Sequence, residues 1–247
     1  MKLALVADLH ANREAVTAVM AHAREQGAER FAFLGDFVGY GADPGWVVDM
    51  VREQVALGAL AVLGNHDAAA VHGPLPSMVA DARVAIEWTQ AHLDAGQRAF
   101  LAKLPMSLTE HGALFVHANA WAPGDWAYIE SRGEAVRSMH ATDCRLTFCG
   151  HMHVPALYHL SEIGKAGDFG PTPGTAVPLS EQRRWLAVPG SAGQPRDGDP
   201  AACYAMFDTA ARTLAFHRVP YDHDGAAAKV RASGLPAGLA ERLIHGG

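Results

Sequence analysis

Five short apolar stretches of this 247-residue chain are each followed at once by side chains that can bind a metal ion. The five motifs are Ala7-Asp8-Leu9-His10, Gly35-Asp36, Gly64-Asn65-His66-Asp67, Val116-His117 and Gly150-His151-Met152-His153. A short apolar run that ends in this way is typical of a buried strand. Because ligands gather beyond the carboxyl ends of the strands in open α/β sheets, we expect these residues to meet at one edge of a sheet. The order of the motifs predicts a two-metal hydrolytic site.

The segments between these motifs alternate between strand and helix patterns. Strands are predicted at 3–7, 31–34 and 58–63, and helices at 12–26, at 43–53 and in two or three pieces between 76 and 104. This alternation predicts parallel strands with helices on the outside. Beyond Pro105, short strands are predicted near 106–110, 112–117, 144–149, 154–159, 185–188, 202–208 and 212–218. Residues 164–178 are rich in Gly and Pro and predict a mobile surface loop, either a lid or a tolerated insertion, and 226–244 predict one or two closing helices.

Length and composition predict one large domain over residues 1–247, since about half of the residues are hydrophobic and can bury a full core. The net charge of -6 gives no basic surface for a polymeric nucleic acid, which we do not expect as a substrate. Three cysteines without paired spacing, and no apolar run long enough for a signal peptide or a membrane span, predict a cytoplasmic protein with no membrane partner.

The donor types of the motifs indicate which ions they could bind. Residues two apart on an extended segment point the same way, so Asp8 and His10 are expected to reach one ion, and His151 and His153 likewise. Imidazole and carboxylate ligands without thiolate suit Mn, Fe or Zn, and do not select among them. Two divalent ions would carry more positive charge than Asp8 and Asp36 neutralise, so the site would attract phosphate and lower the pKa of a bound water.

The five motifs, in this order, resemble those of the calcineurin-like metallophosphoesterases and span residues 1–219. The resemblance implies an α/β fold of four layers, an α/β/β/α sandwich. Residues 220–247, beyond the motifs, are expected to form the helical closing segment. The resemblance also implies two divalent transition-metal ions, with Mn favoured and Fe, Zn, Co or Ni as alternatives. One metal would be held by Asp8, His10, Asp36 and His153, and the other by Asp36, Asn65, His117 and His151, so that Asp36 bridges the two.

The same resemblance assigns a role to His66 without making it a ligand. His66 would reach the leaving-group oxygen as a general acid or charge stabiliser, and Asp67 would orient its ring. The nucleophile would be a metal-bridging hydroxide that attacks phosphorus in line. Taken by itself, His66-Asp67 could also be a turn with a helix cap.

Departures from the family pattern bear on the substrate. The Ser/Thr protein phosphatases resemble Gly-Asp-x-x-Asp-Arg-Gly, and this chain has Tyr40 in place of that phosphate-binding arginine and Asp67 in place of a glutamate. Together with a Pro-Gly-Ser turn within 188–196, this favours the small prokaryotic phosphodiesterase branch. The expected substrate is a small phosphodiester or phosphomonoester. The alternatives are a dinucleoside polyphosphate or nucleotide hydrolase, a protein phosphatase, and a non-catalytic interaction scaffold, which the complete ligand set disfavours.

Four further residues are candidates for substrate contact, each with a structural alternative. Asn12 and Arg13 begin a predicted helix, where phosphate can bind, although a plain cap and a solvated arginine fit equally well. Tyr40 replaces the arginine noted above, and Arg196 could clamp a phosphate or be an exposed loop charge. Trp121 and Trp126 could wall a substrate pocket or form a local hydrophobic cluster.

Overall fold

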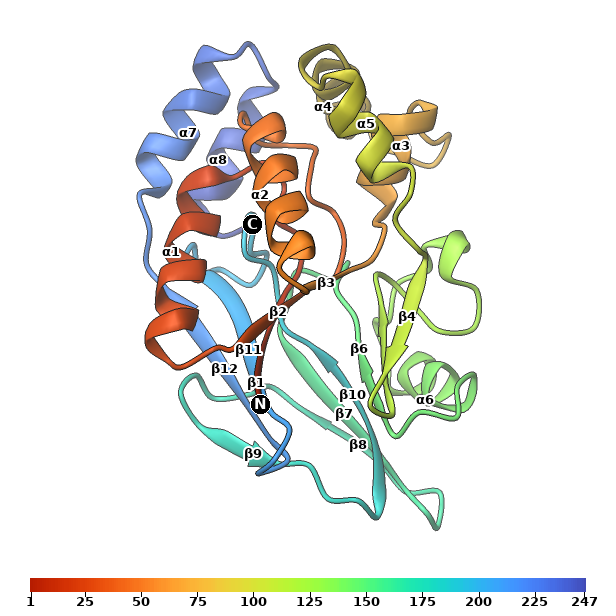
Figure 1. The fold of residues 1–247 in the computed structure, drawn as a ribbon. Coiled ribbons are helices and arrows are strands. Elements are labelled where there is room, and N and C mark those ends of the chain that lie inside the picture. The colour runs from red at the N-terminus through yellow and green to blue at the C-terminus, as the bar shows by residue number, and fades with distance from the viewer.

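The first of two six-stranded sheets is built around the strand that precedes the first motif. In this computed structural model, which describes residues 1–247, the sheet has the order β3-β2-β1-β11-β12-β9 (Figure 1). Its strands are β1 (Lys2–Val6), β2 (Arg30–Phe33), β3 (Leu60–Ala61), β9 (Ala176–Pro178), β11 (Ala202–Asp208) and β12 (Thr213–Val219). β1, β2 and β3 pair in parallel and are joined by the helices α1 (Arg13–Glu25) and α2 (Pro44–Ala56), as the alternation predicted.

The second sheet has the order β4-β5-β6-β10-β7-β8 and contains the strands that precede the last two motifs. Its strands are β4 (Ser107–Glu110), β5 (Ala113–Val116), β6 (Leu146–Phe148), β7 (Ala156–Ser161), β8 (Ala166–Phe169) and β10 (Arg183–Val188). β5 and β6 are parallel, so the residues that follow both strands emerge at the same edge. Sheet pairing therefore brings the His117 motif next to the Gly150 motif.

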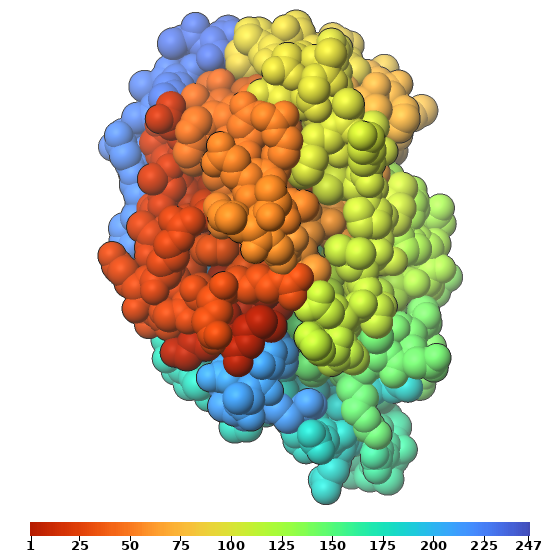
Figure 2. Space-filling view, in the orientation of Figure 1, coloured from red at the N-terminus to blue at the C-terminus, as the bar shows by residue number.

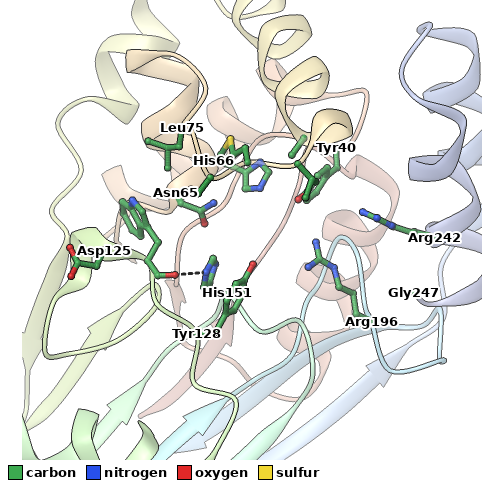
Figure 3. A pocket seen from close by; sticks show the side chains of 15 residues that line it. Tyr40, Asn65, His66, Leu75, Asp125, Tyr128, His151, Arg196, Arg242 and Gly247 are labelled. Atoms are coloured by element: carbon green, nitrogen blue, oxygen red, sulfur yellow. Dashed lines mark hydrogen bonds between the residues drawn. The ribbon is translucent and has the colours of Figure 1, made fainter.

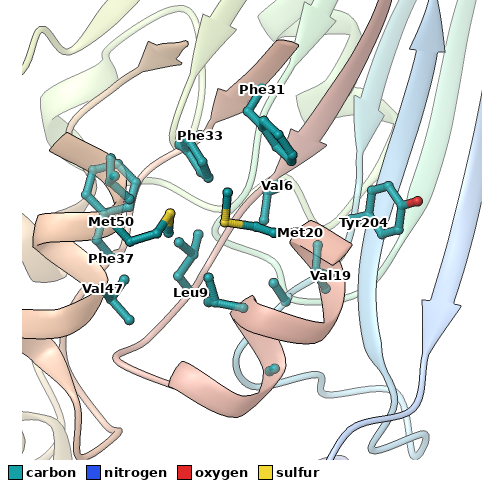
Figure 4. Close-up of a cluster of buried hydrophobic side chains, with 14 of the residues drawn as sticks. Val6, Leu9, Val19, Met20, Phe31, Phe33, Phe37, Val47, Met50 and Tyr204 are labelled. Atoms are coloured by element: carbon teal, nitrogen blue, oxygen red, sulfur yellow. The ribbon is translucent and has the colours of Figure 1, made fainter. Parts of the chain in front are cut away.

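Alternation along the strands sorts side chains into an inner and an outer core. In β1, Leu3 and Leu5 pack between the two sheets, against residues of the second sheet such as Phe115 and Phe148. Ala4 and Val6 point the other way and pack under α1 and α2 (Figure 4). The outer face of the second sheet is covered by α6 (Arg132–His140). These layers confirm the predicted α/β/β/α sandwich.

The remaining helices gather above the carboxyl edge of the sheets. They are α3 (Asn65–His72), α4 (Ala80–His92), α5 (Ala95–Leu101), the short 3-10 helix η1 (Pro123–Asp125), α7 (His223–Ala232) and α8 (Ala237–His245). α4, α7 and α8 share one apolar cluster that also contains Tyr40. No helix is both long enough and apolar enough to cross a membrane.

The prediction of a loop throughout 164–178 is wrong, because the stretch contains two short strands. β8 pairs with β7, and β9 pairs with β12, so each strand forms the edge of one sheet. In Figure 2 the green-to-cyan part of the chain around these residues projects at the lower end of the molecule, away from the yellow α4 and α5. Pro is tolerated in such edge strands, where its missing N–H removes no bond within the sheet.

Candidate functional site

The structure brings the predicted ligands together at the carboxyl ends of β1, β2, β5 and β6 and at the start of α3. Asp8, His10 and His153 form one group, and Asp36, His117 and His151 form a second, each with its ligand atoms within 4.8 Å of one another. Asn65 joins the second group, with its Oδ1 3.0 Å from Nε2 of His117. All seven side chains are buried.

The backbone reaches this arrangement by a route that the strand pattern did not predict. Asp8, His10, His151 and His153 have positive φ angles of 55°, 45°, 71° and 60°, so neither pair lies on an extended segment. Asp8 and His10 still enter one group. His151 and His153 enter different groups, so the expectation from their two-residue spacing that they share an ion is wrong, and the grouping is the one that the resemblance implied. Left-handed conformations cost roughly 1–2 kcal/mol for each such residue, and strain of this kind concentrates at functional sites.

In the first group, the hydrogen bonds of the two histidines fix which nitrogen carries a proton. Nδ1 of His10 contacts the carbonyl of Val38 at 3.1 Å, and Nδ1 of His153 contacts the carbonyl of Gln194 at 2.6 Å. A carbonyl only accepts, so Nδ1 is the donor in both rings. Burial holds the pKa of both histidines well below the usual value, so both rings are neutral. Their Nε2 lone pairs then face each other at 3.1 Å, an arrangement that a cation between them would stabilise.

In the second group, each histidine also donates one ring N–H to a backbone carbonyl. Nδ1 of His117 donates to the carbonyl of Leu34 at 2.7 Å, and Nε2 of His151 donates to the carbonyl of Trp126 at 2.9 Å. The nitrogen atoms left over, Nε2 of His117 and Nδ1 of His151, lie 3.1 Å apart. The ring of His151 is further held by Tyr128, which stacks on it at 4.0 Å between centroids.

Asp36 lies between the two groups. Its Oδ2 is 3.8 Å from Nε2 of His10 and 3.4 Å from Nε2 of His117, and its Oδ1 accepts the backbone N–H of His66 at 2.8 Å. A Cβ at Gly64 would collide with the backbone nitrogen and Oδ1 of Asp36, so only glycine permits this approach. One carboxylate oxygen is thus within reach of a cation in either group.

The ionisable groups of the centre shift one another's pKa values. Burial raises the pKa of Asp8 to about 8, with the charge of Asp36 adding to the effect. Burial opposes the ionisation of Asp36, but the charges of His117, His66 and His10 and the hydrogen bond from His117 together outweigh it and hold the pKa of Asp36 well below its usual range. Asp36 in turn outweighs the burial of His117 and raises its pKa to about 9, whereas burial lowers the pKa of His151 to about 3.

This donor set fits two divalent cations. Acceptor atoms converge in both groups, and each histidine donates its other N–H to a backbone carbonyl, as metal-binding histidines do. Without metal, a proton on His117 partly balances the negative charge of these acceptor atoms. Bound metal ions would balance it more fully.

His66 lies beside the metal-binding groups, at the second position of α3. Its ring lies 4.5 Å from the ring of Tyr40 and 5.0 Å from that of His10, measured between centroids. Its Nδ1 is buried and has no hydrogen-bond partner. Packing therefore holds this ring in place.

Asp67 does not orient His66. Its Oδ1 accepts the backbone N–H groups of Phe37 at 2.8 Å and Val38 at 3.3 Å, and its Oδ2 accepts that of Gly64 at 3.0 Å. The carboxylate caps the start of α3 and fastens it to the loop after β2. The helix-cap alternative therefore describes Asp67, which stabilises the site through the backbone.

A cavity of about 620 Å³ opens beside the second group (Figure 3). His66, Asn65 and His151 contribute to one part of its wall, and Tyr40 and Arg196 to another. Further lining residues are Leu75, Ser77, Met78, Val79, Ala82, Asp125, Trp126, Tyr128, Arg242 and Gly247. Residues 164–178 do not line this cavity, so that stretch is not a lid over it.

The four candidates for substrate contact separate into two pairs. Tyr40 and Arg196 line the cavity, with the guanidinium carbon of Arg196 5.7 Å from the centre of the Tyr40 ring. Arg13 is exposed and lies over the ring of Trp46 instead. Asn12 caps α1, accepting from Ala15, and is fully used by other protein groups. Neither Arg13 nor Asn12 lines the cavity.

Of the two tryptophans considered as a pocket wall, only one lies at the cavity. Trp126 lines the cavity, whereas Trp121 packs in the cluster under α6 with Arg137 over its ring. Two lining residues, Tyr128 and Arg242, were not identified from the sequence. Neither lies in a motif, since Tyr128 is in a loop and Arg242 is on an ordinary amphipathic helix near the end of the chain.

Comparison with known proteins agrees with this geometry. Residues 1–212 match the calcineurin-like phosphoesterase superfamily domain. An uncharacterised protein of Methanocaldococcus jannaschii is 33% identical over 253 residues, which cover 99% of this chain and 98% of that protein. The crystal structure of a metallophosphoesterase from Sphaerobacter thermophilus matches with a TM-score of 0.88 at 35% identity, covering 100% of both chains. A hypothetical protein of Pyrococcus horikoshii, 19% identical, has the same fold, with a TM-score of 0.78 over 100% of this chain and 98% of its own. The chain therefore belongs to the calcineurin-like phosphoesterase superfamily.

Proposed function

We propose that this protein is a hydrolase that uses two divalent transition-metal ions to cleave small phosphodiesters or phosphomonoesters. The observation that carries the proposal is the convergence of two groups of buried acceptor atoms on either side of Asp36, next to a cavity. Hard-to-intermediate cations accept such mixed imidazole and carboxylate ligands, and manganese is the favoured occupant.

Each group would hold one ion. Asp8, His10 and His153 would hold the first, and Asn65, His117 and His151 the second, with Asp36 shared between them. When bound, the ions would polarise the phosphoryl oxygens and lower the pKa of a coordinated water toward neutrality.

The chain itself would position the ester and assist the leaving group. His66 lines the cavity without belonging to either group, so one of its N–H groups can reach the leaving-group oxygen as a proton donor or hydrogen-bond donor. Arg196 adds positive charge at the cavity wall, where it can attract an anionic substrate.

The test is hydrolysis of an aryl phosphodiester and an aryl phosphomonoester by purified protein loaded with manganese. We expect turnover, and we expect His66→Ala to lower kcat by about 10²–10⁴-fold while its metal content stays at the wild-type value. His72→Ala is the matched control, because His72 lies on the same helix and is exposed. No hydrolysis with Mn, Fe, Co, Ni or Zn would refute the proposal.

A second candidate is hydrolysis of dinucleoside polyphosphates or other nucleotides. It is favoured by the aromatic wall of the cavity, which Tyr40, Trp126 and Tyr128 form, since aromatic rings stack on bases. Product analysis on a nucleotide panel tests it, and equal rates for substrates with and without a nucleoside would exclude it.

We further propose that the substrate is small and that the protein acts in the cytoplasm. The acidic net charge disfavours a nucleic-acid polymer, and the three cysteines Cys144, Cys149 and Cys203 are all free.

A further inference from the structure

We propose that Arg196 and Arg242 form a second anion-binding site in the cavity, so that the preferred substrate carries a phosphate group on its leaving group in addition to the ester that is cleaved. The inference rests on the proposed function and names the substrate class for the same site. It makes Arg242 a specificity-determining residue.

The first observation is that both guanidinium groups lack an acidic partner. Arg242 is half-buried and its guanidinium makes no hydrogen bond or ion pair. The partners of Arg196 are all neutral: it donates to the side chain of Gln194 at 3.1 Å and also contacts the hydroxyls of Tyr40 and Tyr128, while its Nε is buried without a partner. Other arginines of the chain, such as Arg30 with Glu110 and Arg231 with Glu241, are paired with carboxylates. A buried donor without a partner costs free energy that a bound anion would recover.

The second observation is where the two arginines lie. They come from separate segments, the loop after β10 and the helix α8, and in Figure 3 both guanidinium groups point into the cavity on the side of Tyr40. The one acidic side chain that lines the cavity, Asp125, lies across the cavity from them, beside Trp126. The side near Arg196 and Arg242 therefore contains two guanidinium groups and no acidic side chain, and Gly247 is labelled next to them.

The third observation is the distance from the metal-binding groups. The ring of Tyr40 is next to both the centre and Arg196, 4.6 Å from the ring of His10, 4.5 Å from that of His66 and 5.7 Å from the guanidinium carbon of Arg196. An anion on the arginine pair would thus lie one aromatic side chain away from His10 and His66. Since His66 is the residue proposed to reach the leaving group, the second anion belongs to the leaving group.

A phosphate fits this pair better than a carboxylate. Each guanidinium can donate two parallel hydrogen bonds to a tetrahedral anion, and two guanidinium groups on different elements can share its oxygen atoms. A dianion also matches the two positive charges. The chemical class is therefore a small phosphate ester whose leaving group is itself phosphorylated.

The experiment compares two aryl phosphates that differ only in the leaving group. Para-methylphenyl phosphate carries no second charge, and para-(phosphonomethyl)phenyl phosphate carries a second anion that cannot be hydrolysed. With the manganese-loaded enzyme, we expect kcat/KM to be about tenfold higher for the phosphonate-bearing ester, as two half-exposed charge-assisted contacts imply. Arg242→Ala should remove most of this preference, because kcat/KM should fall far more for the phosphonate-bearing ester than for para-methylphenyl phosphate.

Arg83→Ala is the matched control, because Arg83 is an exposed arginine on α4 that does not line the cavity, and it should keep the full preference. Equal kcat/KM for the two esters in the wild type, or equal losses on both esters in Arg242→Ala, would overturn the inference.

A binding measurement separates this inference from the proposed function. Calorimetric titration of metal-free protein, which cannot turn the esters over by the proposed route, should show tighter binding of the phosphonate-bearing ester, and Arg242→Ala should abolish the difference. Tighter binding without hydrolysis in any metal would refute the phosphoesterase proposal and keep the anion site. Hydrolysis with equal binding would refute the anion site alone.

Discussion

Gly39→Ala tests whether packing alone holds the ring of His66. Gly39 has a φ of +82°, and a Cβ there would be in hard contact with Nδ1 of His66 and 3.1 Å from its Cγ. The ring makes no hydrogen bond through Nδ1 that could resist displacement. It must therefore move away from the new methyl group.

The substitution has two separable costs. The left-handed backbone conformation should cost roughly 1–2 kcal/mol for alanine, which lowers the free energy of unfolding. Displacement of the ring should lower kcat by about 10²-fold or more, the minimum expected for loss of general acid or base assistance. Because His66 is not in either metal-binding group, the metal content should not change.

The assay pairs kcat on an aryl phosphodiester with urea unfolding and metal analysis. Gly164→Ala is the control, since Gly164 has a nearly equal φ of +78° and a Cβ there would have no atom within 4 Å. It should lose similar stability and keep wild-type kcat. In a His66→Ala background, Gly39→Ala should lower kcat no further. Wild-type kcat in Gly39→Ala, or a loss of bound metal that accounts for the lost activity, would refute the reasoning.

Two further predictions concern the carboxylates of the site. Asp67→Asn places an amide donor near the buried N–H of Gly64, so we expect the free energy of unfolding in urea to fall by about 1–3 kcal/mol. The loss in kcat should be well below that of His66→Ala. A stable variant with the full kcat loss would show that Asp67 acts on His66 after all. Metal binding requires deprotonated ligands. Without metal, the pKa of Asp8 is raised to about 8 and that of His117 to about 9, both above neutral pH. Binding near pH 7 should therefore release both protons. Manganese affinity, measured by calorimetry in buffers of different ionisation enthalpy, should therefore rise steeply with pH through this range and level off above about pH 9; an affinity independent of pH between 6 and 8 would contradict these protonation states.

Residue spacing was enough to identify the ligands but not how they are divided, which only the family resemblance implied. A buried strand followed at once by Asp or His is visible in a few residues of sequence, and parallel pairing then sets all such ends at one edge. The division of His151 and His153 between two groups depends on positive φ angles at both residues, which a strand pattern does not encode.

The role of Asp67 was equally invisible, because its partners are backbone groups. The N–H of Phe37 is 30 positions away in sequence, and any residue type would present the same donor there. A pattern of side chains can therefore identify a carboxylate beside a histidine, yet it cannot tell whether the carboxylate serves that histidine or the chain around it.

Composition misled the prediction for 164–178 for a similar reason. Gly and Pro favour loops on average, but β9 is fixed by pairing with β12, for example Val177 with Leu214, and this partner is distant in the chain. Edge strands need few hydrogen bonds and tolerate poor strand formers. Long-range pairing overrides local propensity here.

The replacement of an arginine by Tyr40 has a different meaning once the cavity is known. Tyr40 packs in the cluster that contains α8, and this brings the helix bearing Arg242 to the edge of the cavity. Positive charge missing from the second motif is thus present nearby, on Arg196 and Arg242, which come from other segments of the chain. An arginine within the motif would contact the phosphoryl group that is cleaved, whereas a pair beyond the tyrosine ring can contact only the rest of the substrate. Positive charge moved from the motif to the far side of Tyr40 would therefore change substrate selection while leaving the metal ligands unaltered.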